Sequence, residues 1–154
     1  MANIYLSSTL LWNGSMEEIF DMVFQSGLDG IELWSQQFFY RKFDIDEFEK
    51  LAALYPLKNC IHSQSWDLNI SSVNDGIRKQ SVTEVKKSVE LAYQLGLDEV
   101  TVHPGHCTIS GIGVSYGAYL KESLREILEY AQKWKIDVSL EIMEKIPREF
   151  VTTM

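Results

Sequence analysis

The sequence Gln-Ser-Gly-Leu-Asp-Gly-Ile at residues 25–31 is matched by Gln-Leu-Gly-Leu-Asp-Glu-Val at residues 94–100. A weaker third copy, Trp-Lys-Ile-Asp-Val, occupies residues 134–138. In each copy a helical segment ends, the chain turns tightly and a strand begins. Such self-similarity is typical of an array of equivalent units. The repeat therefore predicts a chain built from successive βα units.

On both sides of these copies, short β-branched runs alternate with longer segments of helical period along the whole chain. Strands are predicted at residues 3–8, 30–34, 58–63, 99–103 and 137–142. Helices are predicted from Ser15 to Gly27, from Asp44 to just before Pro56, from Ser81 to Gly96, and over residues 119–134. A Ser followed three residues later by Glu forms a capping box at Ser15 and again at Ser81. The alternation predicts a parallel sheet.

Two architectures fit five βα units, an open doubly wound sheet and part of an eight-stranded barrel. The first βα turn, residues 8–15, contains only Gly14, so the glycine fingerprint of dinucleotide-binding sheets is missing. One face of the strands is apolar, with Ile31, Leu33, Val100, Val102, Val138 and Leu140 predicted to face the helices. The opposite face is small or polar, with Gly30, Glu32, Cys60, His62, Thr101, His103, Ser139 and Glu141. A sheet covered by helices on both faces is apolar on both.

The fold class predicted is therefore α/β, a parallel (β/α) TIM barrel that is incomplete, with about five βα units of eight. No linker or low-complexity stretch interrupts residues 1–154, so they are predicted to form one domain, the N-terminal part of such a barrel.

His62, His103 and Glu141 occupy the last inward-facing positions of the third, fourth and fifth predicted strands. Active sites of barrels lie at this C-terminal rim. Neighbouring parallel strands are about 4.8 Å apart, so three such side chains can converge on one point. Two imidazoles and a carboxylate are a normal ligand set for zinc, iron or manganese. A strand histidine taken singly is more often structural, but the ordered trio favours a metal site.

The residues around this trio resemble the xylose isomerase-like superfamily. The resemblance is carried by His62-Ser63, by Trp-Asp-Leu-Asn-Ile-Ser-Ser at residues 66–72, by His-Pro-Gly-His at residues 103–106 and by Leu140-Glu141. That group contains sugar isomerases and epimerases, inosose dehydratases and endonuclease IV-type DNA-repair enzymes. It implies that His62, His103 and Glu141 bind a divalent metal, zinc, manganese or similar. Members add ligands from later strands, and these positions would lie beyond Met154.

The resemblance implies that the parent protein is a metal-dependent sugar or sugar-phosphate isomerase or epimerase. Glu141 would then be a ligand and a catalytic base. A family member needs about 250 residues to complete its barrel, so the 154-residue chain is predicted to be truncated and inactive alone. An abasic-site DNA endonuclease and a non-catalytic, metal-binding or self-assembling βα scaffold are the alternatives. The open edges of the first and last strands predict a homo-oligomer.

Glu32, at the inward end of the second strand, is a second candidate catalytic group. It could equally pair with Arg41 or Lys42. His106 could bind substrate, extend the metal site or exchange protons, and the alternative is an exposed loop histidine. The glycines at positions 111, 113 and 117 predict a loop after the fourth strand that covers substrate.

Trp12, Trp34 and Trp66 follow the first three predicted strands and are candidate sugar-binding residues. Their aromatic faces can pack on the C–H face of a sugar. The alternative is that they cover the top of the barrel.

The net charge of −8 and the lack of a basic cluster make nucleic acid an unfavoured partner. No apolar run is long enough for a membrane span, and the N-terminus lacks the basic region of a secretory signal. The two cysteines, Cys60 and Cys107, suit a reducing compartment. A cytoplasmic location is predicted.

Overall fold

The computed structural model describes residues 3–109 and 114–153. Within these residues five parallel strands form one sheet in the order β1-β2-β3-β4-β5. The strands are β1 (Tyr5–Ser7), β2 (Gly30–Trp34), β3 (Lys58–His62), β4 (Glu99–Val102) and β5 (Asp137–Leu140). All five predicted strands are present, and most are one or two residues shorter than predicted. Strand order follows chain order throughout, as in a barrel and unlike a doubly wound sheet.

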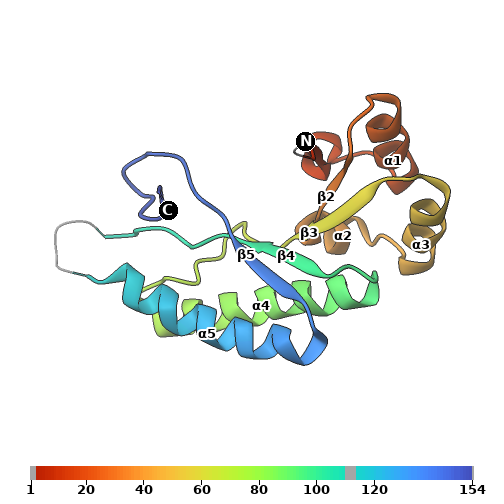
Figure 1. The fold of residues 1–154 in the computed structure, drawn as a ribbon. Coiled ribbons are helices and arrows are strands. Elements are labelled where there is room, and N and C mark those ends of the chain that lie inside the picture. Colours follow the sequence, from red (N-terminus) through yellow and green to blue (C-terminus); the bar gives the residue numbers. More distant parts are fainter. Residues whose placement is uncertain (1–2, 110–113, 154) are drawn as a thin grey trace.

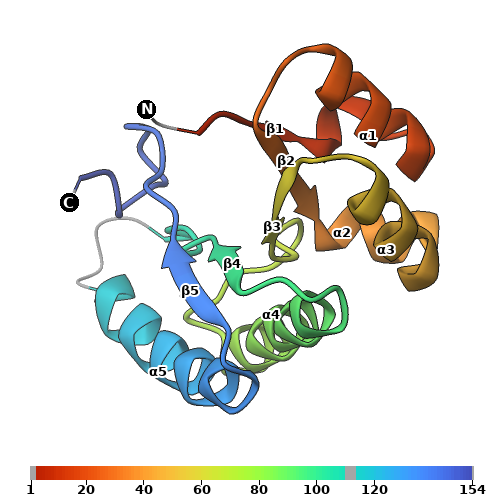
Figure 2. The ribbon, with the colours of Figure 1, turned by 45° about the vertical axis from the view of Figure 1, so that its right-hand side comes forward.

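At least one α-helix lies between each pair of successive strands, and two lie between β2 and β3. They are α1 (Met16–Gln25), α2 (Ser35–Arg41), α3 (Ile45–Leu54), α4 (Asp75–Gln94) and α5 (Tyr116–Trp134), with a short 3₁₀ helix η1 (Ser8–Leu11) after β1. The sheet is curved, and the helices lie along its convex side while the other side is open (Figures 1 and 2). The strand ends that carry the candidate site therefore line the concave side.

Local sequence explains where these helices begin. Ser15 accepts a hydrogen bond from the backbone N–H of Glu18, whose carboxylate in turn accepts from the N–H of Ser15, so this capping box is confirmed. The side chain of Asp44 caps α3 by accepting a hydrogen bond from the N–H of Glu47. The capping box predicted at Ser81 is wrong.

Helix α4 begins six residues before Ser81. Its N-cap is Asn74, whose side chain accepts a hydrogen bond from the N–H of Ile77. Ser81 lies inside the helix, where its hydroxyl donates to the carbonyl of Ile77 and accepts from the N–H of Asn69. The residue therefore joins α4 to the loop after β3.

The apolar face of the sheet packs on the helices as predicted for the inner strands. Ile31, Leu33, Ile61, Val100 and Val102 are at most 1% exposed and belong to the main core. Burial on this scale contributes about 25 cal/mol per Å² of apolar surface, which makes the sheet–helix interface the main stabilising element. Leu140 on β5 is the register partner of the buried Val102 and yet is 36% exposed, so its position at the edge of the described sheet is only partly covered.

The loop predicted to cover substrate lies partly outside the described residues, which end at residue 109 and resume at residue 114. Gly117, its last glycine, lies in the first turn of α5. Among the described helices, none has the length and hydropathy that a membrane crossing requires.

Candidate metal centre

The three predicted ligands lie at the ends of three adjacent strands. His62 is the last residue of β3, and His103 and Glu141 directly follow β4 and β5. The ladder continues past the ends of β3 and β5, since Ser63 N–H donates to Thr101 C=O and Glu141 N–H donates to Val102 C=O. Backbone hydrogen bonds thus fix the height of each side chain on the rim.

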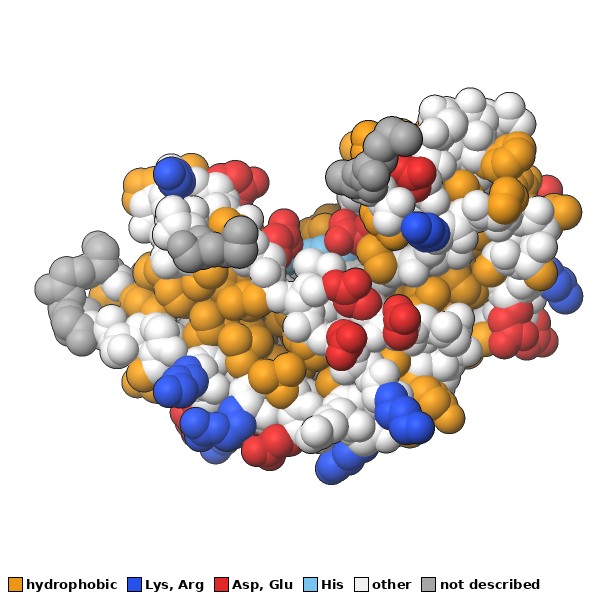
Figure 3. Space-filling model, viewed as in Figure 1, with side chains coloured by type: hydrophobic (Ala, Val, Ile, Leu, Met, Phe, Trp, Pro, Cys, Tyr) orange, Lys and Arg blue, Asp and Glu red, His pale blue; other side chains and the backbone are white. Residues whose placement is uncertain are grey.

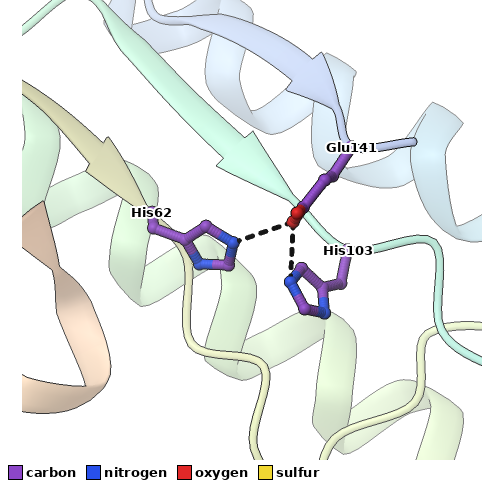
Figure 4. A group of neighbouring side chains, drawn as sticks. All are labelled: His62, His103 and Glu141. Atoms are coloured by element: carbon purple, nitrogen blue, oxygen red, sulfur yellow. Dashed lines mark hydrogen bonds and ion pairs between the residues drawn. The ribbon is translucent and has the colours of Figure 1, made fainter. Parts of the chain in front are cut away.

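The side chains converge on the Glu141 carboxylate (Figure 4). Its Oε2 atom is 3.2 Å from Nε2 of His62 and 2.7 Å from Nε2 of His103. One ligand atom from each residue lies within 4.8 Å of the other two. The structure therefore brings together the trio predicted from the strand ends, and their role as metal ligands remains a prediction.

The environment of His62 decides which ring nitrogen carries hydrogen. Its Nδ1 atom is 2.8 Å from the carbonyl oxygen of Ser63. A carbonyl only accepts, so Nδ1 carries the hydrogen and the Nε2 of a neutral ring presents its lone pair to Glu141. A lone pair and a carboxylate oxygen facing each other repel unless a proton or a cation lies between them. The donor set thus fits a divalent metal held by two Nε2 atoms and a carboxylate.

Glu141 is ionised at neutral pH. The imidazoles of His103 and then of His62, both within hydrogen-bond distance, hold the pKa of its carboxyl well below the usual range, although partial burial acts in the opposite direction. A lowered pKa favours the folded state above the normal carboxyl pKa, and this contribution is lost as the pH falls toward the folded-state value. The carboxylate therefore stays available as an anionic ligand through the whole physiological range.

The three residues differ in their access to solvent. The side chain of His62 is 2% exposed, whereas those of His103 and Glu141 are 29% and 39% exposed. His103 also lines a cavity of about 760 Å³. In the space-filling view, histidine surface lies at the floor of a notch with acidic side chains at its edges (Figure 3). A small molecule can reach the group from the side of His103.

The His-Pro-Gly-His sequence shapes the loop beside this cavity. Gly105 has a φ of +78°, and a Cβ atom there would lie 2.3 Å from Oδ1 of Asn69. That oxygen accepts from the N–H groups of Ser71 and His106, while Nδ2 of Asn69 donates to the carbonyl of His106. Glycine is thus required for the two rim loops to approach each other.

The predicted sugar-binding tryptophans form one aromatic cluster. Ring centroids are 4.7 Å apart for Trp12 and Trp66, and 5.7 Å apart for Trp34 and Trp66. Trp34 is the last residue of β2, in agreement with the strand predicted at residues 30–34, and its indole stacks on the His62 ring. Trp66 is 47% exposed and, with His106, lines the cavity. Their role in substrate binding remains a prediction.

Glu32 does not join the metal group. It lies on β2 opposite Cys60 of β3, two residues before Trp34. The proposed pairing with Arg41 is wrong, because the Arg41 guanidinium donates to the carbonyl of Asn13. No ion pair links Glu32 to Lys42 in the part of the chain that the structure describes. Burial, followed by the charges of Glu32 and Glu99, raises the pKa of the Cys60 thiol to about 12, which leaves it unreactive.

Sequence reasoning missed one acidic residue at the cavity. The side chain of Glu149 is only 4% exposed, and its Oε1 accepts from Nε of Arg148 at 3.1 Å. Its Oε2 is buried without a partner among the described residues. The C-terminal segment folds back to this position through hydrogen bonds from Cys107 N–H to Arg148 C=O and from Met143 N–H to Val151 C=O. No local pattern in the sequence signals that reversal.

Two sequence comparisons agree with the geometry. The profile of the family described as "Xylose isomerase-like TIM barrel" matches residues 20–154. An uncharacterised protein of Methanocaldococcus jannaschii is 30% identical over 154 residues, an alignment that covers 96% of this chain and 57% of that protein. The chain thus spans little more than half the length of this relative.

Solved structures show the same fold. A D-tagatose 3-epimerase-like protein superposes with a TM-score of 0.78 at 23% identity, covering 97% of this chain and 56% of the other. An L-ribulose 3-epimerase superposes with a TM-score of 0.75 at 20% identity, covering 97% and 52%. At these identities the likeness shows the fold alone. It confirms the parallel (β/α) barrel class, of which this chain supplies about half.

Proposed function

The chain belongs to the xylose isomerase-like TIM barrel family, and on this basis we propose that it forms the N-terminal part of a single barrel domain in a metal-dependent isomerase or epimerase. The substrate class is a sugar or sugar phosphate. The observation that carries the proposal is the convergence of two Nε2 atoms on one ionised carboxylate at the C-terminal rim. The likeness to sugar epimerases supports the substrate class. The predicted cytoplasmic location remains part of the proposal.

In this proposal His62, His103 and Glu141 hold a divalent cation such as zinc or manganese. A cation held there would supply positive charge that polarises a sugar carbonyl and the adjacent hydroxyl. Glu141, ionised at neutral pH, would also accept the proton from the hydroxyl-bearing carbon next to the carbonyl. Return of a proton to the opposite face of that carbon, or to the former carbonyl carbon, would complete epimerisation or isomerisation. Glu32 lies on β2 two residues before the end of the strand, opposite Cys60, and serves as an accessory group.

The cavity beside His103 receives the substrate. Trp12 and Trp66 offer aromatic faces to the C–H side of the sugar, and Trp34 completes their cluster. His106 and the buried carboxylate of Glu149 line the same cavity. The Oε2 of Glu149 is buried without a partner among the described residues, which costs about 1–3 kcal/mol.

The test of this proposal measures the conversion of sugars and its dependence on a divalent metal. The protein, in a form that completes the barrel, is incubated with Mn²⁺ or Zn²⁺ and a panel of ketoses that includes D-tagatose, D-psicose and L-ribulose. We expect epimerised or isomerised product that disappears after chelation. Anomalous scattering from a crystal of the 154-residue chain should show a peak between the three side chains. Incision of abasic DNA without any sugar conversion would instead support the endonuclease alternative and overturn the proposal.

A second candidate function, a self-assembling scaffold, is favoured by one apolar surface. A groove of about 870 Å³ runs between α5 and β5, with Leu120, Leu124, Leu128, Ile136 and Val138 among its lining residues. Figure 3 shows part of this hydrophobic area beside α5. Within the described residues β5 pairs only with β4, so its other edge offers free backbone groups.

We expect the 154-residue chain to form a homo-oligomer through this surface. Sedimentation velocity at rising protein concentration should show a dimer or larger species. Leu128 is 49% exposed. The Leu128→Lys variant places a charge in this surface and should raise the dissociation constant of the oligomer by about tenfold or more. The matched control is Leu54→Lys, at a position 71% exposed on α3. A monomer at all concentrations would contradict the expectation.

A further inference from the structure

Trp34 makes an unusually close and parallel contact with a predicted ligand. The Trp34 and His62 ring centroids are 3.9 Å apart and the ring planes differ by 5°. The two residues are register partners in the β2–β3 ladder, so the backbone itself places them side by side. The ring of His103 stands edge-on to both of them, at 4.7 Å from the His62 ring. His62 is thus enclosed on one full face by indole.

The end of β2 also holds the backbone of His62. The hydroxyl of Ser35, which follows Trp34, donates to the carbonyl of His62 at 2.9 Å. Trp34 is itself held, because its N–H donates to the hydroxyl of the fully buried Ser8 at 3.0 Å. With the bond from Nδ1 to Ser63, the His62 ring is restrained at its face, at one nitrogen and at its main chain.

We propose that Trp34 is a positioning residue that orients the His62 imidazole toward Glu141. The indole face blocks rotation of the ring away from the line between Nε2 and Glu141. An indole face is also electron-rich, and an imidazole that carries positive charge or binds a cation is electron-poor, so the stack becomes stronger in that state. The part that concerns metal affinity rests on the proposed function, whereas ring orientation does not.

The indole nitrogen of Trp34 determines which substitutions are suitable for the test. Nε1 of Trp34 is buried and has no partner among the described residues, so no hydrogen bond of this group holds the ring in place. Phenylalanine can therefore preserve the stack without loss of a bond, while leucine keeps apolar volume and removes the aromatic face. We compare Trp34→Leu and Trp34→Phe with the unchanged chain.

The first measurement is independent of any metal. In the metal-free protein, ring currents of the indole should shift the carbon-bound ring protons of His62 upfield in the NMR spectrum. We expect Trp34→Leu to lose that shift and Trp34→Phe to retain part of it. The control is Trp134→Leu, because Trp134 packs on Tyr93 and Tyr130 instead. Unchanged His62 signals in Trp34→Leu, with the fold intact by circular dichroism, would overturn the inference whatever the metal result.

The second measurement is titration calorimetry with Zn²⁺. Residues that orient a metal ligand typically contribute 10- to 100-fold to affinity. We expect about tenfold weaker binding for Trp34→Leu, a smaller loss for Trp34→Phe and no change for Trp134→Leu. If the unchanged chain binds no Zn²⁺, the proposed metal site fails while the NMR result still decides the role of Trp34. Equal affinity for Trp34→Leu and the unchanged chain would overturn the link to metal binding.

Discussion

Substitution of Glu141 by glutamine is expected to weaken Zn²⁺ binding by more than about 100-fold, which corresponds to roughly 2.7 kcal/mol. Glu141 is the one anionic member of the group, and the Nε2 atoms of His62 and His103 both point at its Oε2. Glutamine keeps the size of the side chain but removes the negative charge that attracts a cation. Titration calorimetry at pH 7.5 measures the change directly.

The control for this variant is Glu144→Gln. Glu144 is an exposed acid three residues further along the same segment and belongs to no metal group among the described residues. Its replacement changes the net charge by the same amount and should leave affinity within about twofold, because exposed charges are screened. A Glu141→Gln variant that bound Zn²⁺ within threefold of the unchanged chain would refute the proposed ligand set.

Substitution of Gly30 by alanine is expected to reduce the free energy of unfolding by about 3 kcal/mol or more. A Cβ atom at this position would lie 1.9 Å from the backbone oxygen of Lys58 and 2.6 Å from a ring carbon of Tyr5. Both neighbours are register partners of Gly30, so relief requires the strands to move apart. Overpacking a rigid site costs about 1–3 kcal/mol, and a clash with backbone belongs at the upper end.

Thermal unfolding followed by circular dichroism tests this expectation. For a chain of this size about 3 kcal/mol corresponds to a fall in Tm of roughly 6–12 °C. Gly117→Ala is the matched control, since nothing lies within 4 Å of a Cβ atom there and the residue is in α5. Alanine favours helix by up to about 1 kcal/mol, so this control should be neutral or stabilising. A Gly30→Ala variant with unchanged Tm would show that the β1–β2–β3 register is looser than described.

The sequence was sufficient for the sheet, because strand signals are short, apolar and bounded by turns. It was less informative about helices that begin without a side-chain cap. Helix α2 follows β2 directly, and its N-cap residue Trp34 provides no capping hydrogen bond. At α4 the error was a choice between two plausible caps. Ser81 and Glu84 have the spacing of a capping box, yet Asn74 caps the helix and Ser81 bonds inside it.

The candidate site was predictable as far as backbone geometry determines it. Strand alternation and the common height of parallel strand ends suffice to bring His62, His103 and Glu141 together. Strand geometry predicts neither the orientation of individual side chains nor the way in which the C-terminal segment folds back on the chain. The stack of Trp34 on His62 depends on rotamers, and the burial of Glu149 depends on hydrogen bonds between segments far apart in sequence.

The sequential pairing of the strands has a consequence for the order of assembly. Each described strand pairs only with its neighbours in the chain, so the sheet can grow from β1 onward as the polypeptide leaves the ribosome. The three rim side chains come from β3 and from the residues that directly follow β4 and β5, so the group is complete only once residue 141 has been synthesised. Cation binding would then report that β5 has joined the sheet, and pulse-labelled nascent chains released before residue 141 should not bind the cation.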